Sequence, residues 1–263
     1  MITSDERLRM RATFNRIADV YSRVRPTLPA AMFDDLAELT GIGAGSRVLE
    51  IGCGPGTASL PLAERGYQLL AVELGPQLAE LATARLAGHP SAGVVVADFD
   101  RWTPQRPDFD VIFSSTAFHW LDPATRYDRT ADLLVPGGSL AVSGTRQIMG
   151  GTERFFIDAQ SCYRRYYQGG SEPPPRADQV PQGTYLGGNG RYRKPVFRRY
   201  EWDVEYDTAD YLALVSTYSA TLELAPPVAA GLLRDIGGLI DGRYGGRVTK
   251  RYLAELRVAK RAD

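Results

Sequence analysis

Cysteine and histidine are scarce in this chain of 263 residues, which has two of each. Cys53 and Cys162 are too few to form the disulfide framework of a small secreted protein, so we expect two reduced thiols and a cytoplasmic location. We expect no metal ion in the protein. His89 precedes a proline in a loop and is predicted to lie at the surface, whereas His119 falls in a more informative segment that is described below.

Long hydrophobic runs are also missing. None approaches the roughly 18 residues that a membrane-spanning helix needs. The first residues include Asp5, Glu6 and Arg7, so we expect no signal peptide there. Hydrophobic residues make up 44% of the chain, which fits a globular protein without membrane contact, either a monomer or a homodimer.

An excess of charge of one sign is absent as well, because 31 basic residues face 31 acidic residues. Residues 1–150 carry 14 Arg against 17 Asp and Glu, hence −3, and residues 151–263 carry 17 Lys and Arg against 14, hence +3. A nucleic-acid binder has a stronger basic footprint, so we expect no nucleic-acid partner. The basic stretch Arg191–Arg199 contains aromatic residues that could stack on bases. Charge and proline also protect an exposed edge strand, and we favour that interpretation.

The most informative segment reads Val-Leu-Glu-Ile-Gly-Cys-Gly-Pro-Gly over residues 48–56. A short apolar strand is followed by glycines at alternate positions and then by a helix pattern from Thr57 to Arg65. Glycines let the backbone turn sharply and approach a ligand closely. The spacing differs from the G-x-G-x-x-G of dinucleotide sites. Glu50 would repel a diphosphate and attract a cation, and a sulfonium or ammonium group would supply one.

Strand and helix patterns alternate after this loop. Continuous apolar strands between helices indicate a buried parallel sheet with helices on both faces. Helices are also predicted at 7–24 and Ala30–Leu39, before the first strand. The strands are predicted at Val48–Ile51, Gln68–Glu73, Val94–Ala97, Phe109–Ser114 and Leu140–Ser143, and the other helices at Pro76–Leu86 and Pro123–Leu134.

The last third of the chain changes character. Residues 150–195 contain glycine pairs and a triple proline, but also a helix-like aromatic cluster. Such an insertion is usually a functional lid or disordered, and the aromatic residues favour a lid. Tyr200–Tyr206 and Tyr252–Val258 alternate strictly, so both are expected as half-exposed strands at a sheet edge. Thr208–Leu224 between them is predicted as one helix.

These segments together resemble the class I S-adenosylmethionine (SAM)-dependent methyltransferases, in the type 11 small-molecule group that includes trans-aconitate methyltransferase. The matching segments are Val48–Thr57, Ala71–Glu73, Ala97–Phe99, Phe109–Asp122, Leu134–Gly138 and Tyr21–Pro26. The resemblance implies a doubly wound, mostly parallel seven-stranded sheet with an antiparallel C-terminal edge strand. It divides a single domain, 1–263, into a helical cover (1–40), a cofactor-binding core (41–146), the lid (150–195) and C-terminal strands and helix (196–263).

The resemblance implies that SAM, and the product S-adenosylhomocysteine, bind without a metal. Glu73 would accept hydrogen bonds from the ribose, as strand-end acids do in dinucleotide folds, and Asp98 would accept from the adenine amino group with Phe99 against the ring. Alternatively, Glu73 is a solvated carboxylate at a strand end, and Asp98 caps a turn. The full set expected around the cofactor is Glu50, Gly52, Cys53, Gly54, Gly56, Thr57, Glu73, Leu74, Asp98, Phe99, Ser114 and Ser115.

The acceptor side of the site is less defined. His119 follows the fourth strand, where a neutral imidazole could remove a proton from a hydroxyl or amine. Alternatively, it shapes the pocket together with Trp120. Arg25 could bind a carboxylate of cofactor or substrate, or could be a surface charge. Aromatic residues of the leader, the lid and the predicted C-terminal helix could line the substrate wall or belong to the core: Tyr21, Tyr163, Tyr167 and Tyr218.

The predicted reaction is methyl transfer from SAM to an oxygen, nitrogen or carbon atom of a small molecule. Three alternatives stay open: a SAM-binding protein without turnover, an RNA or protein methyltransferase, and a nicotinamide-dependent oxidoreductase. Neutral charge disfavours RNA, and Ser115-Thr-Ala-Phe118 lacks the Asn/Asp-Pro-Pro-Tyr pattern of such enzymes. The glycine spacing and Glu50 disfavour the oxidoreductase.

Overall fold

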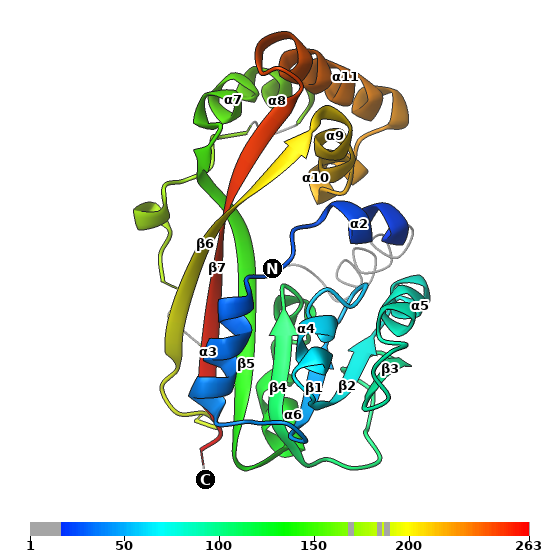
Figure 1. Cartoon of the computed structure of the whole chain (residues 1–263), viewed down its shortest axis with the longest axis vertical. Coiled ribbons are helices and arrows are strands. Elements are labelled where there is room, and N and C mark those ends of the chain that lie inside the picture. Colours follow the sequence, from blue (N-terminus) through cyan, green and yellow to red (C-terminus); the bar gives the residue numbers. More distant parts are fainter. Residues whose placement is uncertain (1–16, 168–170, 183–185, 187–189, 263) are drawn as a thin grey trace.

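Seven strands form one sheet in the order β3-β2-β1-β4-β5-β7-β6 (Figure 1). The computed structural model describes residues 17–167, 171–182, 186 and 190–262. The first five strands in this order, β3, β2, β1, β4 and β5, are parallel, whereas β7 pairs antiparallel with both β5 and β6. The predicted doubly wound, mostly parallel sheet is therefore confirmed. The strands are β1 Arg47–Ile51, β2 Gln68–Glu73, β3 Ala92–Val96, β4 Phe109–Ser115, β5 Leu134–Gly151, β6 Val196–Asp207 and β7 Arg247–Lys260.

Two expectations about the last strands were wrong. Tyr252–Val258 and Tyr200–Tyr206 were both predicted at a sheet edge. Only β6, which contains the second segment, lies there, because β7 lies between β5 and β6. Both faces of β7 are covered, and Leu253 is as buried as its neighbours on the other face. The fifth strand was predicted at Leu140–Ser143, but β5 extends on both sides of that segment. It pairs with β4 as far back as Leu134 and with β7 as far as Gly151.

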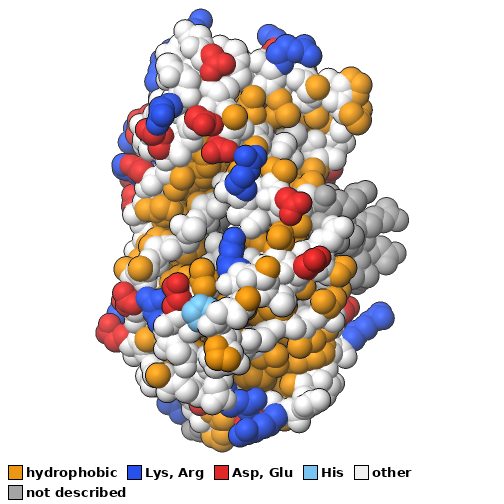
Figure 2. Space-filling model, turned by 45° about the vertical axis from the view of Figure 1, so that its right-hand side comes forward, with side chains coloured by type: hydrophobic (Ala, Val, Ile, Leu, Met, Phe, Trp, Pro, Cys, Tyr) orange, Lys and Arg blue, Asp and Glu red, His pale blue; other side chains and the backbone are white. Residues whose placement is uncertain are grey.

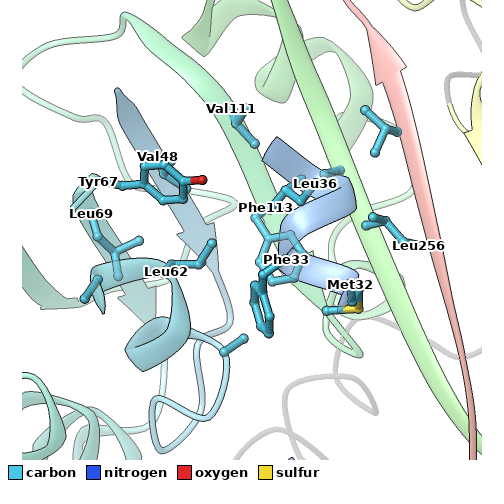
Figure 3. Packing of buried hydrophobic residues seen from close by; sticks show 14 of the residues in the cluster. Met32, Phe33, Leu36, Val48, Leu62, Tyr67, Leu69, Val111, Phe113 and Leu256 are labelled. Carbon is cyan, nitrogen blue, oxygen red and sulfur yellow. The ribbon is translucent and has the colours of Figure 1, made fainter. Parts of the chain in front are cut away.

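Hydrophobic side chains alternate between the two faces of the sheet. Val48 of β1 belongs to the cluster under α3 (Ala30–Thr40) and α4 (Ser59–Glu64), and Figure 3 shows Phe33 and Leu36 of α3 packed toward Phe113. Leu49 belongs to the opposite cluster, which includes residues of α6 (Arg126–Leu133). The first of these faces also carries α5 (Pro76–Arg85), whose Ala82 packs on Ala71 of β2. Burial on both faces explains the continuous apolar strands of the sequence.

A helical cap stands over the far ends of β5, β6 and β7 (Figure 1). Its core joins residues of the segment 150–195, such as Phe155 and Tyr163, to Tyr211, Leu232 and Ile236 from the C-terminal part. The aromatic cluster predicted as helical in the insertion is therefore helical. The cap helices are α7 Glu153–Asp158, α8 Gln160–Tyr166, α9 Thr208–Ser216, α10 Ser219–Leu222 and α11 Pro226–Arg243.

The cap differs from the sequence prediction in two places. The helix predicted at Thr208–Leu224 is broken, because Tyr218 is extended between α9 and α10. Helix α11 was not predicted, since its glycines have low helix propensity. One of them has a packing role: a Cβ on Gly231 would lie 3.0 Å from the ring of Tyr166 on α8. Glycine thus lets two cap helices approach closely.

Helix α2, Ala18–Val24, connects the cap to the core. Arg85 of α5 donates to Ser22 at 3.0 Å, and Arg25, just after α2, donates to Thr217 beyond α9. The helix predicted at 7–24 is observed from residue 18, and residues 7–16 lie outside the described residues. Within the described part of the chain, no helix is long and apolar enough to cross a membrane.

We predict that Gly151→Ala destabilises the protein more than Gly245→Ala. Both glycines are left-handed, with φ of +62° and +63°, which costs another residue roughly 1–2 kcal/mol. A Cβ on Gly245 would meet nothing within 4 Å, but one on Gly151 would overlap the carbonyl oxygen of Thr249, at the irregularity where β5 meets β7. We expect an additional ~1–3 kcal/mol for Gly151→Ala in urea unfolding. Equal losses would contradict the close approach of the two strands.

Candidate active site

A cavity of about 510 Å³ lies at the carboxyl ends of β1, β2 and β4 and extends under α9 and α10. Ligands of open parallel sheets bind at this edge. The segment after α2 lines one side of the cavity, and β5 and β7 line another. In Figure 2, hydrophobic side chains gather across the middle of the face shown, and charges of both signs are interspersed around them.

The glycine loop after β1 is fixed to β2. The Gly52 N–H donates to the Val72 carbonyl at 2.8 Å, and the Gly54 N–H donates to a Glu73 carboxylate oxygen at 2.9 Å. All three loop glycines have positive φ, so each turn needs glycine. A Cβ added at Gly52 would lie 2.5 Å from the Ala117 side chain, and one added at Gly56 would lie 3.1 Å from α5. A Cβ added at Gly54 would meet nothing within 4 Å. Of the three, Gly52 and Gly54 line the cavity, and Gly54 leaves room for a ligand.

Glu50 is a buried carboxylate at the base of this loop, 1% exposed. Its Oε2 accepts a hydrogen bond from Ser59 at 2.5 Å. Burial, with the nearby charge of Glu73, raises the pKa of Glu50 to about 7, although the Ser59 hydrogen bond opposes that shift. Burial also raises the pKa of the Cys53 thiol, so this cysteine is a neutral, unreactive neighbour.

Glu73 ends β2 and is held by backbone groups on both sides. Its Oε1 accepts from the Gly75 N–H at 2.8 Å, while Oε2 accepts from Gly54. Each oxygen has a second lone pair for a ligand hydroxyl. Glu73, Leu74 and Thr57 all line the cavity.

The segment after β3 is held in place by Arg129. Its Nη2 donates to the carbonyls of Phe99 and Trp102, and its guanidinium lies 5.4 Å from the Phe99 ring. Phe99 lines the cavity, whereas Asp98 does not. The Asp98 carboxylate accepts from the Asp100 N–H at 3.3 Å, which is the turn-capping arrangement.

The end of β4 carries both predicted serines. Ser114 is buried and donates to the Ile51 carbonyl at 2.9 Å, so it joins β4 to β1 and does not line the cavity. Ser115 lines the cavity and accepts from Ser143 at 2.8 Å. The next residue, Thr116, has φ of +53° and also lines the cavity. A left-handed threonine stores strain, which concentrates at functional sites.

His119 and Trp120 line the cavity in a short 3-10 helix, Phe118–Trp120. Their ring centroids lie 4.7 Å apart. Partial removal from water, together with the positive charge of Arg126, lowers the pKa of His119. The imidazole is therefore neutral at physiological pH, as a proton acceptor must be.

The predicted acceptor residues fall into two groups. Tyr21, Arg25 and Tyr218 line the cavity, and the Arg25 guanidinium lies over both tyrosine rings, at 4.7 Å and 5.5 Å. Tyr163 and Tyr167 do not line it. Their rings stack on each other at 5.4 Å, and their hydroxyls bond within the cap, to Tyr211 and Thr221.

The sequence prediction missed the residues that β5 and β7 contribute. Thr145, Gln147, Lys250 and Tyr252 line the cavity. Gln147 pairs in register with Tyr252, so these side chains lie on one face of the sheet. Extending the alternation of Tyr252 and Ala254 by two residues would have placed Lys250 on that buried face. No group of three or more metal-binding side chains occurs in the described ranges.

Comparisons with known proteins agree with this fold. Residues 48–138 match the sequence model of a methyltransferase-domain family. The trans-aconitate 2-methyltransferase of Methylobacterium radiotolerans is 35% identical over 119 residues, 44% of this chain and 43% of that protein. An uncharacterized methyltransferase of Mycobacterium tuberculosis is 29% identical over 133 residues, 51% of this chain and 52% of that one. The chain thus spans about half the length of the curated relatives it matches.

A solved structure from Anaeromyxobacter dehalogenans, provisionally identified as a type II methyltransferase, shares the fold over 89% of this chain and 97% of that chain. Its TM-score is 0.62 at 22% sequence identity. The family match covers the glycine loop and strands β1 to β4, which build the cavity edge described above. Residues 48–138 therefore match a methyltransferase domain, and the chain has the fold of the class I SAM-dependent methyltransferases.

Proposed function

We propose that this protein transfers a methyl group from SAM to a small acceptor molecule. One observation carries the proposal: a glycine loop and two buried carboxylates, Glu50 and Glu73, meet at the cavity edge. Two acids favour a cationic ligand over the diphosphate of a nicotinamide cofactor. The residues therefore fit SAM, which when bound supplies a methyl carbon already activated by its sulfonium.

The cofactor roles divide along the cavity. Glu73 would accept hydrogen bonds from the ribose hydroxyls, and Phe99 would pack on the adenine ring. Glu50 would supply negative charge to the methionine portion, where the Gly54 backbone leaves room for a ligand. Asp98 does not line the cavity, so it would have to reach the adenine amino group from outside the cavity wall. The protein mainly binds, aligns and excludes water, since the displacement needs little other help.

Three observations favour a small acceptor. The cavity extends from the glycine loop to Tyr218 and to Lys250, which is buried. Three of the five basic residues in the stretch 191–199 are paired with acids: Arg191 with Asp128 and Asp132, Arg198 with Asp35, and Arg199 with Glu255. This pairing reduces the charge that the stretch offers to a nucleic acid. One similar protein is named for methylation of trans-aconitate, a small molecule.

Calorimetry with S-adenosylhomocysteine and NAD tests the cofactor directly. We expect the first to bind and NAD not to bind. Glu73→Gln should weaken S-adenosylhomocysteine binding at least tenfold, about 1.4 kcal/mol, because an amide nitrogen cannot accept hydrogen bonds. Glu80→Gln, on the exposed face of α5, serves as the matched control and should leave affinity unchanged. Preferential NAD binding would reject the proposal.

Cofactor affinity should depend on pH through Glu50. A cationic ligand favours the ionised carboxylate, whose pKa is raised to about 7 in the free protein. Below that pH the carboxyl must lose a proton on binding, so we expect affinity for S-adenosylhomocysteine to fall about tenfold from pH 8 to pH 6. The ammonium group of S-adenosylhomocysteine supplies the positive charge. Glu50→Gln should bind more weakly and show no such slope in the same titrations. A slope that persists in this variant would exclude Glu50 as its source.

His119→Ala should lower kcat about 100-fold, as expected for the loss of a general base. The acceptor can be found by labelled methyl uptake from metabolite pools, and initial rates then measure the variant. His89→Ala is the matched control, since His89 lies outside the cavity. An unchanged rate with His119→Ala would show that no base is needed there, as for a carboxylate oxygen acceptor.

A further inference from the structure

Lys250 is a buried cation without an acidic partner among the residues that the structure describes. It is 2% exposed and lines the cavity from β7. Its Nζ donates to the Tyr218 hydroxyl at 2.5 Å, and the rings of Tyr211, Tyr218 and Tyr252 lie 5.1–5.6 Å from it. Burial, and then the charge of Arg25, lower the pKa of Lys250 to about 7. A buried ammonium without a counter-ion costs stability, so its presence in a cavity points to a ligand.

The polar atoms around Lys250 are mostly donors. Arg25 uses Nε and Nη2 on Thr217, which leaves Nη1, and no carboxylate of the described part of the chain pairs with it. The Tyr218 hydroxyl accepts from Lys250, so its own proton is available to a ligand. The buried Gln147 Nε2 has no hydrogen-bond partner in the described structure. Two cations and two neutral donors at one end of a cavity fit an anion.

We propose that Lys250, with Arg25, Tyr218 and Gln147, binds an anionic group of the acceptor, so that the molecule methylated carries a carboxylate or a phosphate at the end that enters under α9 and α10. This inference rests on the proposed function. The anion supplies the negative charge that no described residue of the chain provides for Lys250. The aromatic rings exclude water around the ion pair, which strengthens it.

The cofactor's own carboxylate is the competing occupant, because SAM and S-adenosylhomocysteine both carry one. The two cases differ in what Lys250→Met does. If the acceptor's anion binds here, the variant keeps its affinity for S-adenosylhomocysteine and loses the anion. If the cofactor's carboxylate binds here, cofactor affinity falls.

The test begins with the protein saturated with S-adenosylhomocysteine, and that binding is measured first. Benzoate, phenyl phosphate and benzamide are then titrated into wild type, Lys250→Met and the control Lys260→Met, which removes an exposed charge from the same strand. We expect benzoate or phenyl phosphate to bind to wild type and the control, and benzamide not to bind. The anion that binds more tightly identifies the group. Lys250→Met should lose at least tenfold in anion affinity and stay within twofold for S-adenosylhomocysteine.

Thermal unfolding gives a second readout that needs no ligand. Lys250 titrates near pH 7 when folded, facing Arg25, Tyr211, Tyr218 and Tyr252, and near pH 10.4 when unfolded. The unfolded chain binds more protons between these values, so wild-type stability from this group rises with pH over that window. Lys250→Met should raise Tm at pH 7 and remove this rise.

Equal binding of benzoate and benzamide would overturn the inference, as would anion binding that survives in Lys250→Met or is absent from wild type. A loss of S-adenosylhomocysteine affinity in Lys250→Met would assign the subsite to the cofactor and overturn it as well. Failure of wild type to bind S-adenosylhomocysteine in the first step would instead contradict the proposed function, so the two failures are distinguishable.

Discussion

The antiparallel pairing of β5 with β7 is the constraint on which the rest of the molecule depends. It runs from Ser139 opposite Lys260 to Ile148 opposite Arg251, well past the end of the parallel strands. The same two strands therefore belong to the core at one end and carry the cap at the other (Figure 1). Because side chains alternate across a strand, this register sets Gln147 and Tyr252 on one face, with Lys250 two residues further along. The cavity wall under the cap is thus a direct consequence of strand register.

The glycine loop shows how one motif meets several demands at once. Gly52 approaches the segment after β4, Gly56 approaches α5, and Gly54 leaves space at the cavity. The loop stays in place because the Val72 carbonyl and the Glu73 carboxylate of β2 accept its N–H groups. Glu73 therefore orders the loop even before it meets a ligand. This arrangement limits the reorganisation needed on binding, which favours affinity.

The core was predictable because local pattern and tertiary role agree there. The apolar run before Gly52 and the acid at the end of β2 predicted the position of the cavity edge. Because both faces of the sheet are buried, the strands are continuous apolar runs that can be recognised in the sequence. The cap was less predictable. The glycines of α11 lower helix propensity while Gly231 serves packing against Tyr166, a long-range contact that no local pattern reports. Tyr163 shows a second reason: its helical aromatic spacing was compatible with a substrate wall or with the core, and only the tertiary structure shows its hydroxyl bonded to Tyr211 inside the cap.

Glu50 and Lys250 give the cavity two poles of opposite charge that are not paired with each other. Burial favours the neutral form of both groups and brings the pKa of each to about 7, so neither is fully charged in the free protein at neutral pH. A cation at the Glu50 end would favour the ionised carboxylate, and an anion at the Lys250 end would favour the ammonium. Methyl transfer from a sulfonium to an anionic acceptor would bring these two charges into one site. The separation of the poles along the cavity would then orient the two molecules, with the cofactor at the glycine loop and the acceptor under the cap.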